Sequence, residues 1–212
     1  IVKCTIFRFS ELRLTMDKYD FSFTASSLRL NELRLVAKHQ IAGSEINFTN
    51  ELGNGKSSTG RRMLAEFTKR LSFLTEDQKE LLVHIDLTSQ RQIAFLSACK
   101  THLFLRDFVV EVIREKLLIF DYVLTEGEYI SFYRRKSDLH SEMDELTEVT
   151  ANKIRQVTFK ILEQAGIIDN VRSKNIQQQL VSDKVASTIA AVDRQWLKIF
   201  LMSDVDIENV KI

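Results

Sequence analysis

An all-helical, multi-helix globular fold is predicted by the composition of the chain. Its 212 residues include no proline and six glycines. Sandwiches and barrels need Gly/Pro-rich turns roughly every 8–12 residues, whereas helices do well without proline, which costs about 3 kcal/mol in a helix interior. Hydrophobic residues make up 44% of the chain, which favours a packed core over disorder. All-α is therefore the expected class. A pattern of helix, short helix, capped turn and polar-faced helix occurs twice along the chain and predicts two helix-turn-helix-like units around a central helical core.

The first predicted helix covers residues 27–42. A stripe of apolar residues recurs at helical spacing, and Gly43 ends the pattern. A short helix is expected within 44–52, and the glycine-rich segment 53–59 is the clearest turn in the chain. We assign these elements, with the helix that follows, to an N-terminal unit at residues 16–86.

The next predicted helix, about residues 58–74, separates charge by face. At about 100° per residue its apolar side chains fall on one side. Arg61, Arg62 and Lys69 fall opposite, with Arg70 on the flank. The free N–H groups of the first turn would form an anion site where a DNA phosphate could bind. An ordinary solvated helix is the competing interpretation, because basic faces are common.

The middle of the chain is predicted to be scaffold. Apolar residues at helical spacing indicate long buried helices at 76–85, 89–105 and 107–120. A further helix begins at Thr125, because Glu128 stands three residues later in the capping-box pattern.

A second helix with a polar outer face is predicted at residues 150–165, capped by Thr150 and ended by Gly166. Its outer residues are Asn152, Lys153, Gln156 and Lys160, with Arg155 at the edge. Amide side chains can hydrogen-bond base edges, notably adenine, and lysines can meet phosphates. A solvated face is again the competing interpretation, since it is the default for a surface helix.

The C-terminal part completes the second unit. Residues 167–180 carry Arg172 and Lys174 and are compatible with a small hairpin, or β wing, and a last helix is expected at 185–202. We assign the central helices and this helix-turn-helix or winged-helix-like unit to residues 87–212.

No catalytic residue, metal or cofactor is expected. The run from Gly55 to Ser57 suggests a phosphate-binding loop, but that motif needs a glycine where Asn50 stands and a buried strand before it. Cys99 and His102 lie one helical turn apart, whereas a structural zinc site needs four such ligands. No nucleophile elbow is recognisable.

A cytoplasmic protein without membrane contact is expected. Cys4 and Cys99 cannot form a disulfide framework, which fits a reducing compartment. The most apolar stretch, residues 104–120, is interrupted by charged residues and so does not predict a membrane span. Because Met16 would make a natural start, we treat residues 1–15 as an extension without assigned function.

The formal net charge of +1 argues neither for nor against binding of nucleic acid. The distribution of charge along the chain is therefore the relevant evidence. That patterning predicts binding to double-stranded DNA through basic, amide and hydroxyl side chains of both units. In the first unit the candidates are Lys56, Ser57, Ser58, Thr59, Arg61, Arg62, Lys69 and Arg70. In the second unit they are Thr150, Asn152, Lys153, Arg155, Gln156, Lys160, Arg172 and Lys174.

Longer segments carry a resemblance to a known family. Residues 91–101 (RQIAFLSACKT) and 105–116 (LRDFVVEVIREK) closely resemble BrxA, a core protein of bacteriophage exclusion (BREX) systems. The similarity continues through TANKIRQV at 150–157, LEQAGII at 162–168, FSFTA at 21–25 and the basic residues of 61–71. It covers nearly everything from residue 16 to about residue 180.

The resemblance implies an all-helical monomer with two helix-turn-helix motifs, binding duplex DNA without a catalytic step. It also implies partner proteins encoded with it, among them an adenine methyltransferase, an ATPase, a phosphatase-like protein and a protease-like protein. The family tends to have a polar residue near Gly53, where this loop is rich in glycine.

Two alternatives remain open at this point. The first is a protein–protein adaptor, in which the acidic stretch 137–148 and the basic faces dock other defence proteins. The second follows from an older view of the family as relatives of an RNA-binding transcription antitermination factor. RNA binding favours exposed aromatic side chains as stacking platforms. Phe159, which falls away from the core stripe, is the one candidate, and a domain contact is the preferred interpretation of it.

Overall fold

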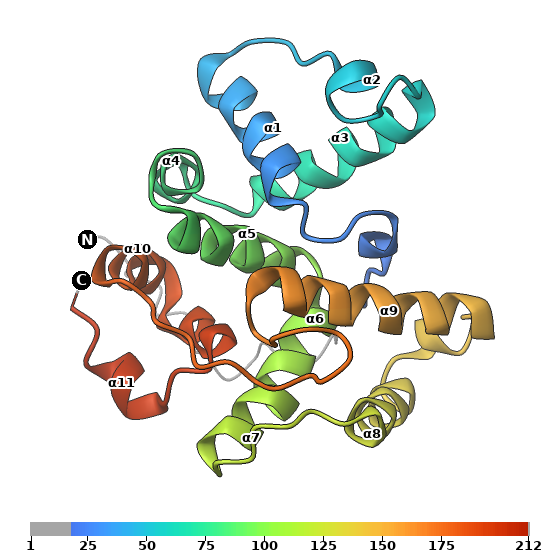
Figure 1. Cartoon of the computed structure of the whole chain (residues 1–212), viewed down its shortest axis with the longest axis vertical. Coiled ribbons are helices and arrows are strands. Elements are labelled where there is room, and N and C mark those ends of the chain that lie inside the picture. The colour runs from blue at the N-terminus through green and yellow to red at the C-terminus, as the bar shows by residue number, and fades with distance from the viewer. Residues whose placement is uncertain (1–17, 212) are drawn as a thin grey trace, which may run out of the picture.

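The computed structural model describes residues 18–211 and confirms the all-α fold (Figure 1). The predicted extension at 1–15, with Cys4, lies outside the described residues. The α-helices are α1 (Leu30–Ala42), α2 (Phe48–Glu51), α3 (Ser57–Ser72), α4 (Glu76–His84), α5 (Leu87–Thr101), α6 (Leu103–Phe108), α7 (Glu115–Leu118), α8 (Glu126–Ser137), α9 (Glu148–Ala165), α10 (Asp183–Asp193) and α11 (Asp204–Glu208). Short 3₁₀ helices are η1 (Ser22–Ala25), η3 (Ser141–Met143) and η4 (Arg194–Phe200), and η2 (Val109–Arg114) is a π-helix.

Helix caps explain several boundaries. The capping box predicted at the start of α8 is confirmed: the Thr125 side chain accepts from the Glu128 N–H, and the Glu128 carboxylate accepts from the Thr125 N–H. Gly166, at φ +77°, ends α9 as predicted. The prediction that Thr150 caps α9 is wrong, because Thr147 is the cap and accepts from the Thr150 N–H at 3.2 Å.

The central helices break one turn earlier than predicted, at His102. This residue has φ −124° and ψ 89°, outside the helical region, and separates α5 from α6. Its ring is fully buried and hydrogen-bonded to segments distant in sequence. A tertiary contact therefore sets this break, and the local apolar pattern gave no sign of it.

The C-terminal region is less regular than predicted. The expected helix at 185–202 is α10 followed by the tighter η4, because Asp193 is extended and its side chain accepts from the Gln195 N–H. The expected wing at 167–180 forms no strand. Its only pairings among the described residues are two isolated antiparallel bridges, Ile168 with Ile176 and Asn175 with Val123.

The buried side chains form one core cluster that reaches from Tyr19 to Ile207. Its centre is aromatic, and Phe159 belongs to it with an exposed fraction of 4%. The Phe159 ring lies 6.2 Å from that of Phe108 and 5.5 Å from that of Tyr129. Phe159 is therefore a packing residue, in line with the domain contact preferred from the sequence, and not an exposed stacking platform. Between residues 18 and 211 the helices fall short of the length and apolar character that a bilayer span demands.

Candidate nucleic-acid interface

Two glycines allow α2 and α3 to meet at a tight corner. A Cβ atom on Gly60 would lie 2.1 Å from the backbone oxygen of Phe48, and one on Gly53 would lie 2.3 Å from that of Lys56. Such distances are far inside van der Waals contact, so only glycine fits both positions. This close approach fixes the direction in which α3 leaves the turn.

The N-terminal half of α3 presents basic and hydroxyl groups to solvent. Ser57, Ser58 and Thr59 are exposed on its first turn, although no side chain caps the helix. Lys56 before the helix and Arg61 and Arg62 within it are exposed, and none of them forms an ion pair with any residue of 18–211. The Arg61 guanidinium lies 6.0 Å from the centre of the Phe48 ring. These cations are available to a polyanion.

Arg70 does not belong to that surface, which corrects its predicted place on the flank of the helix. Its side chain is fully buried. Nε donates to Glu66 at 2.8 Å, Nη1 donates to the backbone oxygen of Ser27 at 2.9 Å, and Nη2 donates to that of Ser26 at 2.8 Å. Arg70 therefore binds the chain itself, and because it is buried a phosphate cannot reach it.

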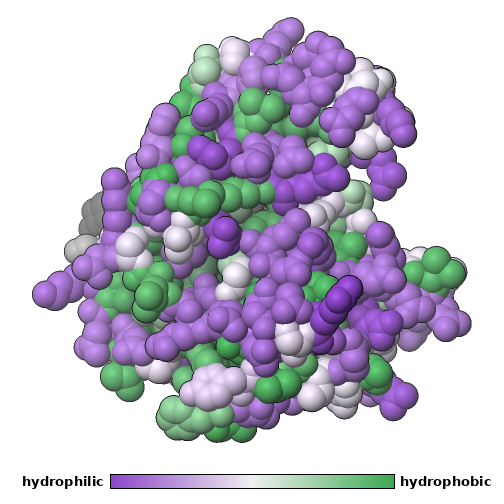
Figure 2. Space-filling model, in the orientation of Figure 1, coloured by the Kyte–Doolittle hydropathy of each residue, from purple (hydrophilic) through white to green (hydrophobic). Residues whose placement is uncertain are grey.

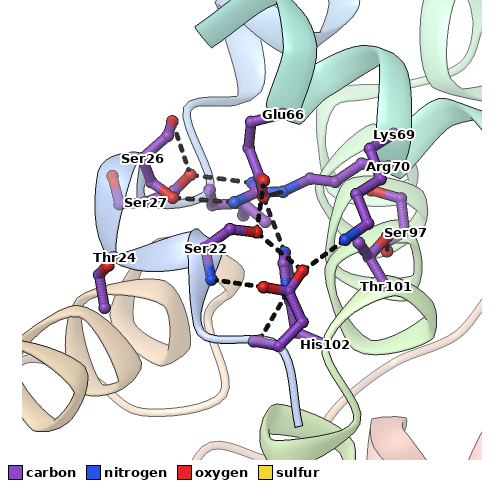
Figure 3. Close-up of polar contacts among 12 residues, drawn as sticks. Ser22, Thr24, Ser26, Ser27, Glu66, Lys69, Arg70, Ser97, Thr101 and His102 are labelled. Carbon is purple, nitrogen blue, oxygen red and sulfur yellow. Dashed lines mark hydrogen bonds and ion pairs between the residues drawn. The ribbon is translucent and has the colours of Figure 1, made fainter. Parts of the chain in front are cut away.

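The backbone that Arg70 holds belongs to a segment we call the strap, residues 20–29, which includes η1 and runs between α3 and α9 (Figures 1 and 3). Asp20 on the strap pairs with Lys69, and Ser22 donates to Glu66 at 3.1 Å. Lys69 is thus exposed, as predicted, yet already has an acidic partner. The Lys69 ammonium contacts Asp20 of the strap and is also exposed to solvent.

The buried centre of these contacts is Glu66, which Figure 3 shows between Arg70 and His102. Burial by itself would raise the pKa of the Glu66 carboxyl. The hydrogen bond from His102 and the charge of Arg70 outweigh burial and lower that pKa to about 2. Glu66 is therefore ionised, and the strap is tied to α3 by charge-assisted hydrogen bonds away from water.

The second candidate surface is the outer face of α9. Asn152, Lys153, Gln156 and Lys160 are exposed, as their helical positions predict. Lys153 has no ion pair with a described residue, whereas Lys160 pairs with Glu163 one turn along the same helix. Arg155 and the half-buried Thr150 are less available: Arg155 pairs with Glu126 at 3.2 Å, and the hydroxyls of Thr150 and Thr147 hydrogen-bond each other.

A hollow of about 330 Å³ joins α9 to the strap, and we call it the cationic groove. Lys153, Gln156 and Lys160 line one side, and residues 24–27 with Arg29 line the other. Arg29 and the strap hydroxyls could not be predicted to join this surface, because they come from more than a hundred residues earlier in the chain. In Figure 2 the surface around this part of the molecule is mainly hydrophilic.

The two predicted DNA-binding residues in the loop after α9 differ in exposure and in ion pairing. Arg172 is exposed and makes no ion pair within residues 18–211. Lys174 instead pairs with Glu126 at 3.0 Å, and its ammonium lies 5.4 Å from the centre of the Phe159 ring. Because its side chain is 13% exposed, Lys174 holds the loop onto α8 and α9 and offers little to a ligand.

These features define an all-helical protein with basic surfaces on α3 and α9 joined by the strap. A family model described as BrxA matches residues 17–193. The chain belongs to the BrxA family.

Two known proteins are similar to it. The "BREX protein BrxA" of Bacillus cereus (strain H3081.97) is 25% identical over 136 residues, which cover 64% of this chain and 68% of that protein. A crystal structure of an uncharacterized protein from Magnetospirillum magneticum has a TM-score of 0.75 and 19% identity, and covers 87% of this chain and 98% of that chain. At this identity the second likeness shows the fold alone.

Proposed function

We propose that this protein is a non-enzymatic component of a BREX phage-defence system that binds double-stranded DNA through α3 and α9. The BREX role rests on membership of the BrxA family and on the name of the Bacillus cereus relative. Other BREX proteins, including the methyltransferase and ATPase that the sequence resemblance implies, are then its protein partners.

DNA binding is supported chiefly by the fact that some basic side chains have acidic partners, whereas others, on the proposed surface, have none among residues 18–211. Internal acids neutralise Arg70, Lys174 and Arg155. Arg61 and Arg62 at the exposed start of α3 have no acidic partner within residues 18–211, and neither has Lys153 beside the cationic groove. A net charge of +1 is therefore compatible with a local anion-binding surface.

The geometry suggests a division of labour between the two helices. We interpret the short α2, the tight turn and α3 as a helix-turn-helix-like unit; in such units the second helix enters the major groove N-terminus first. Exposed hydroxyls and free N–H groups on the first turn of α3 can bind phosphate oxygens. The cationic groove holds the backbone nearby, and the amides of Asn152 and Gln156 can reach base edges.

The test is a salt titration of duplex affinity for the parent and for the double variant Arg61→Ala/Arg62→Ala. Each neutralised phosphate contributes about 0.9 to the slope of log affinity against log salt. The double variant should bind more weakly and lose about two from that slope. Both side chains are exposed, so the fold should be kept.

A matched control removes the same charge elsewhere. Lys184→Ala/Lys211→Ala changes two exposed lysines at α10 and near the C-terminus, away from α2 and the N-terminal end of α3 (Figure 1). This control should keep the parent's affinity and slope. If it weakens binding as much as the arginine variant, or if neither variant changes binding, α3 is not the DNA surface.

Parallel titrations with single-stranded DNA and looped RNA separate the alternatives. A protein–protein adaptor would show weak attraction to all three polyanions without selectivity. RNA binding would show preference for looped RNA, but burial of Phe159 removes the stacking platform on which the sequence argument for RNA depended.

A further inference from the structure

A second hollow, of about 350 Å³, lies on the other side of α9 from the cationic groove, between α9 and α8. Tyr129, Ile130 and Tyr133 of α8 form one wall. The rings of Tyr129 and Tyr133 are tilted by 35° with their centres 6.2 Å apart. The opposite wall and rim come from α9, through Asn152 and Arg155. We call this hollow the aromatic pocket.

One polar atom in the wall lacks a partner. The hydroxyl of Tyr129 is buried and makes no hydrogen bond with any described residue, and the whole residue is 3% exposed. Burial, followed by the nearby Tyr133 hydroxyl, raises the pKa of Tyr129, so its hydroxyl keeps a proton to donate. Leaving such a group unpaired is unfavourable. Tyr129 lines the aromatic pocket together with Tyr133 and Arg155.

The other groups at the pocket have complementary chemistry. The exposed Asn152 amide offers a donor and an acceptor in one plane, which matches the hydrogen-bonding edge of a base. Arg134 at the rim is exposed and makes no ion pair with residues 18–211, so it can meet a phosphate. Aromatic faces, an amide and cations together are the elements with which proteins hold an unstacked base.

We propose that the aromatic pocket receives one unstacked nucleobase of the bound nucleic acid. The proposal rests on the proposed DNA binding and adds to it a preference for an unpaired or displaced base. In the bound state the base stacks against Tyr133 and its edge meets Asn152. The side-chain shift that admits the base uncovers the Tyr129 hydroxyl, which then gains the partner that it lacks.

The aromatic pocket adjoins the proposed DNA surface, because the residues of both lie around the same helix, α9. At about 100° per residue, Asn152 and Gln156 fall between the side that faces the aromatic pocket and the side that carries Lys153 and Lys160. The two amides therefore form a ridge with the cationic groove on one flank and the pocket on the other. A strand whose phosphates lie in the groove can pass a base over this ridge.

The experiment compares two duplexes of two helical turns, one fully paired and one with a single unpaired 2-aminopurine. The full chain should bind the second duplex roughly tenfold more tightly. Because 2-aminopurine fluorescence responds to stacking, it should also change when the protein binds. Two pocket variants, Asn152→Ala and Tyr129→Phe, should each lower affinity for the duplex with the unpaired base more than affinity for the paired duplex, and so lose most of this preference.

Matched controls locate the effect. Tyr122→Phe removes a hydroxyl from an exposed tyrosine outside the pocket and should keep the preference. Arg61→Ala/Arg62→Ala should weaken binding of both duplexes by the same factor. Equal affinity of the parent for both duplexes overturns the proposal, and so does a preference that survives in both pocket variants.

Failure of the proposed DNA binding can be distinguished from failure of base binding in the aromatic pocket. If neither duplex binds, DNA binding is wrong, and a titration with 2-aminopurine deoxynucleoside monophosphate alone decides the pocket. A fluorescence change that Asn152→Ala abolishes supports the pocket, and no change overturns it. Protection of Tyr133 from chemical modification by another BREX protein, without any response to the base, would also overturn it, in favour of a protein side chain.

Discussion

His102 donates a hydrogen bond from Nε2 to Oε1 of Glu66 across 2.7 Å, in the interior where α3, the strap and the start of α6 meet. The other ring nitrogen, Nδ1, faces the backbone oxygen of Asp20 at 3.1 Å. Both partners are acceptors, so this arrangement needs a hydrogen on each ring nitrogen. The same Glu66 oxygen accepts from Arg70 Nε. One buried carboxylate therefore connects three segments of the chain.

Acid should loosen this connection. The pKa of Glu66 is about 2 in the folded protein against an ordinary value of 4.5, because the His102 hydrogen bond and the Arg70 charge outweigh burial. Its contribution to stability is thus complete above pH 4.5 and is lost as the pH falls towards 2. The loss should reach roughly 3 kcal/mol. Urea unfolding across this pH range measures it.

Glu66→Gln is the control for that experiment. The variant should be less stable at neutral pH and should lose less stability between pH 4.5 and 2, since it has no carboxyl to protonate. Identical pH dependence in parent and variant would show that other acids, such as Asp20, control the acid response.

Alanine substitutions at Arg70 and at its neighbour Lys69 should lower stability by very different amounts. Arg70→Ala removes the cation paired with buried Glu66 and the donor to two strap carbonyls, which should cost about 3–5 kcal/mol. Lys69→Ala removes an exposed pair and should cost less than about 1 kcal/mol. Chemical unfolding separates the two. Equal losses would contradict the assignment of Arg70 to the interior.

Gly60→Ala should disturb the corner between α2 and α3. The new Cβ would meet backbone and not a flexible side chain, so one helix must shift, at a cost of about 1–3 kcal/mol. Duplex affinity should fall with it. Gly127→Ala in α8 is the matched control, because its nearest neighbour would be the Thr125 hydroxyl at 3.9 Å. That control should be neutral or slightly stabilising, and thermal unfolding of both variants checks the contrast.

Tyr129→Phe should leave the protein as stable as the parent or stabilise it by up to about 1 kcal/mol, since the deleted hydroxyl has no partner within residues 18–211. Tyr19→Phe should instead destabilise it, because the Tyr19 hydroxyl donates to Asp107 at 2.6 Å. A clear loss of stability in Tyr129→Phe would indicate that the hydroxyl is already satisfied in the unbound protein.

The fold could be predicted from the sequence where local patterns determine structure. Apolar periodicity located the helices, and Thr125 and Gly166 marked two of their ends because caps depend on neighbouring residues. The break at His102 could not be predicted, since its hydrogen-bond partners come from the strap and α3. The shift from Thr150 to Thr147 reflects two threonines that are equally suitable as caps.

The candidate site was predicted only in part, for the same reason. Exposed positions on α3 and α9 followed from helical spacing. Arg70 was misplaced because a basic residue beside an apolar stripe was taken as exposed, while the carbonyls that bind it lie more than forty residues away in the sequence. Arg29 was missed because only the folded chain brings it to Lys153.

The strap has a consequence for how this protein would respond to ionic strength. Arg70 and Glu66, which hold the strap, are buried, and dissolved salt screens buried charges little. Added salt would weaken attraction to a polyanion at the exposed cations while the spacing between α3 and α9 stays the same. Ionic strength would then change the affinity of the protein for a polyanion without changing the distance between its two basic surfaces.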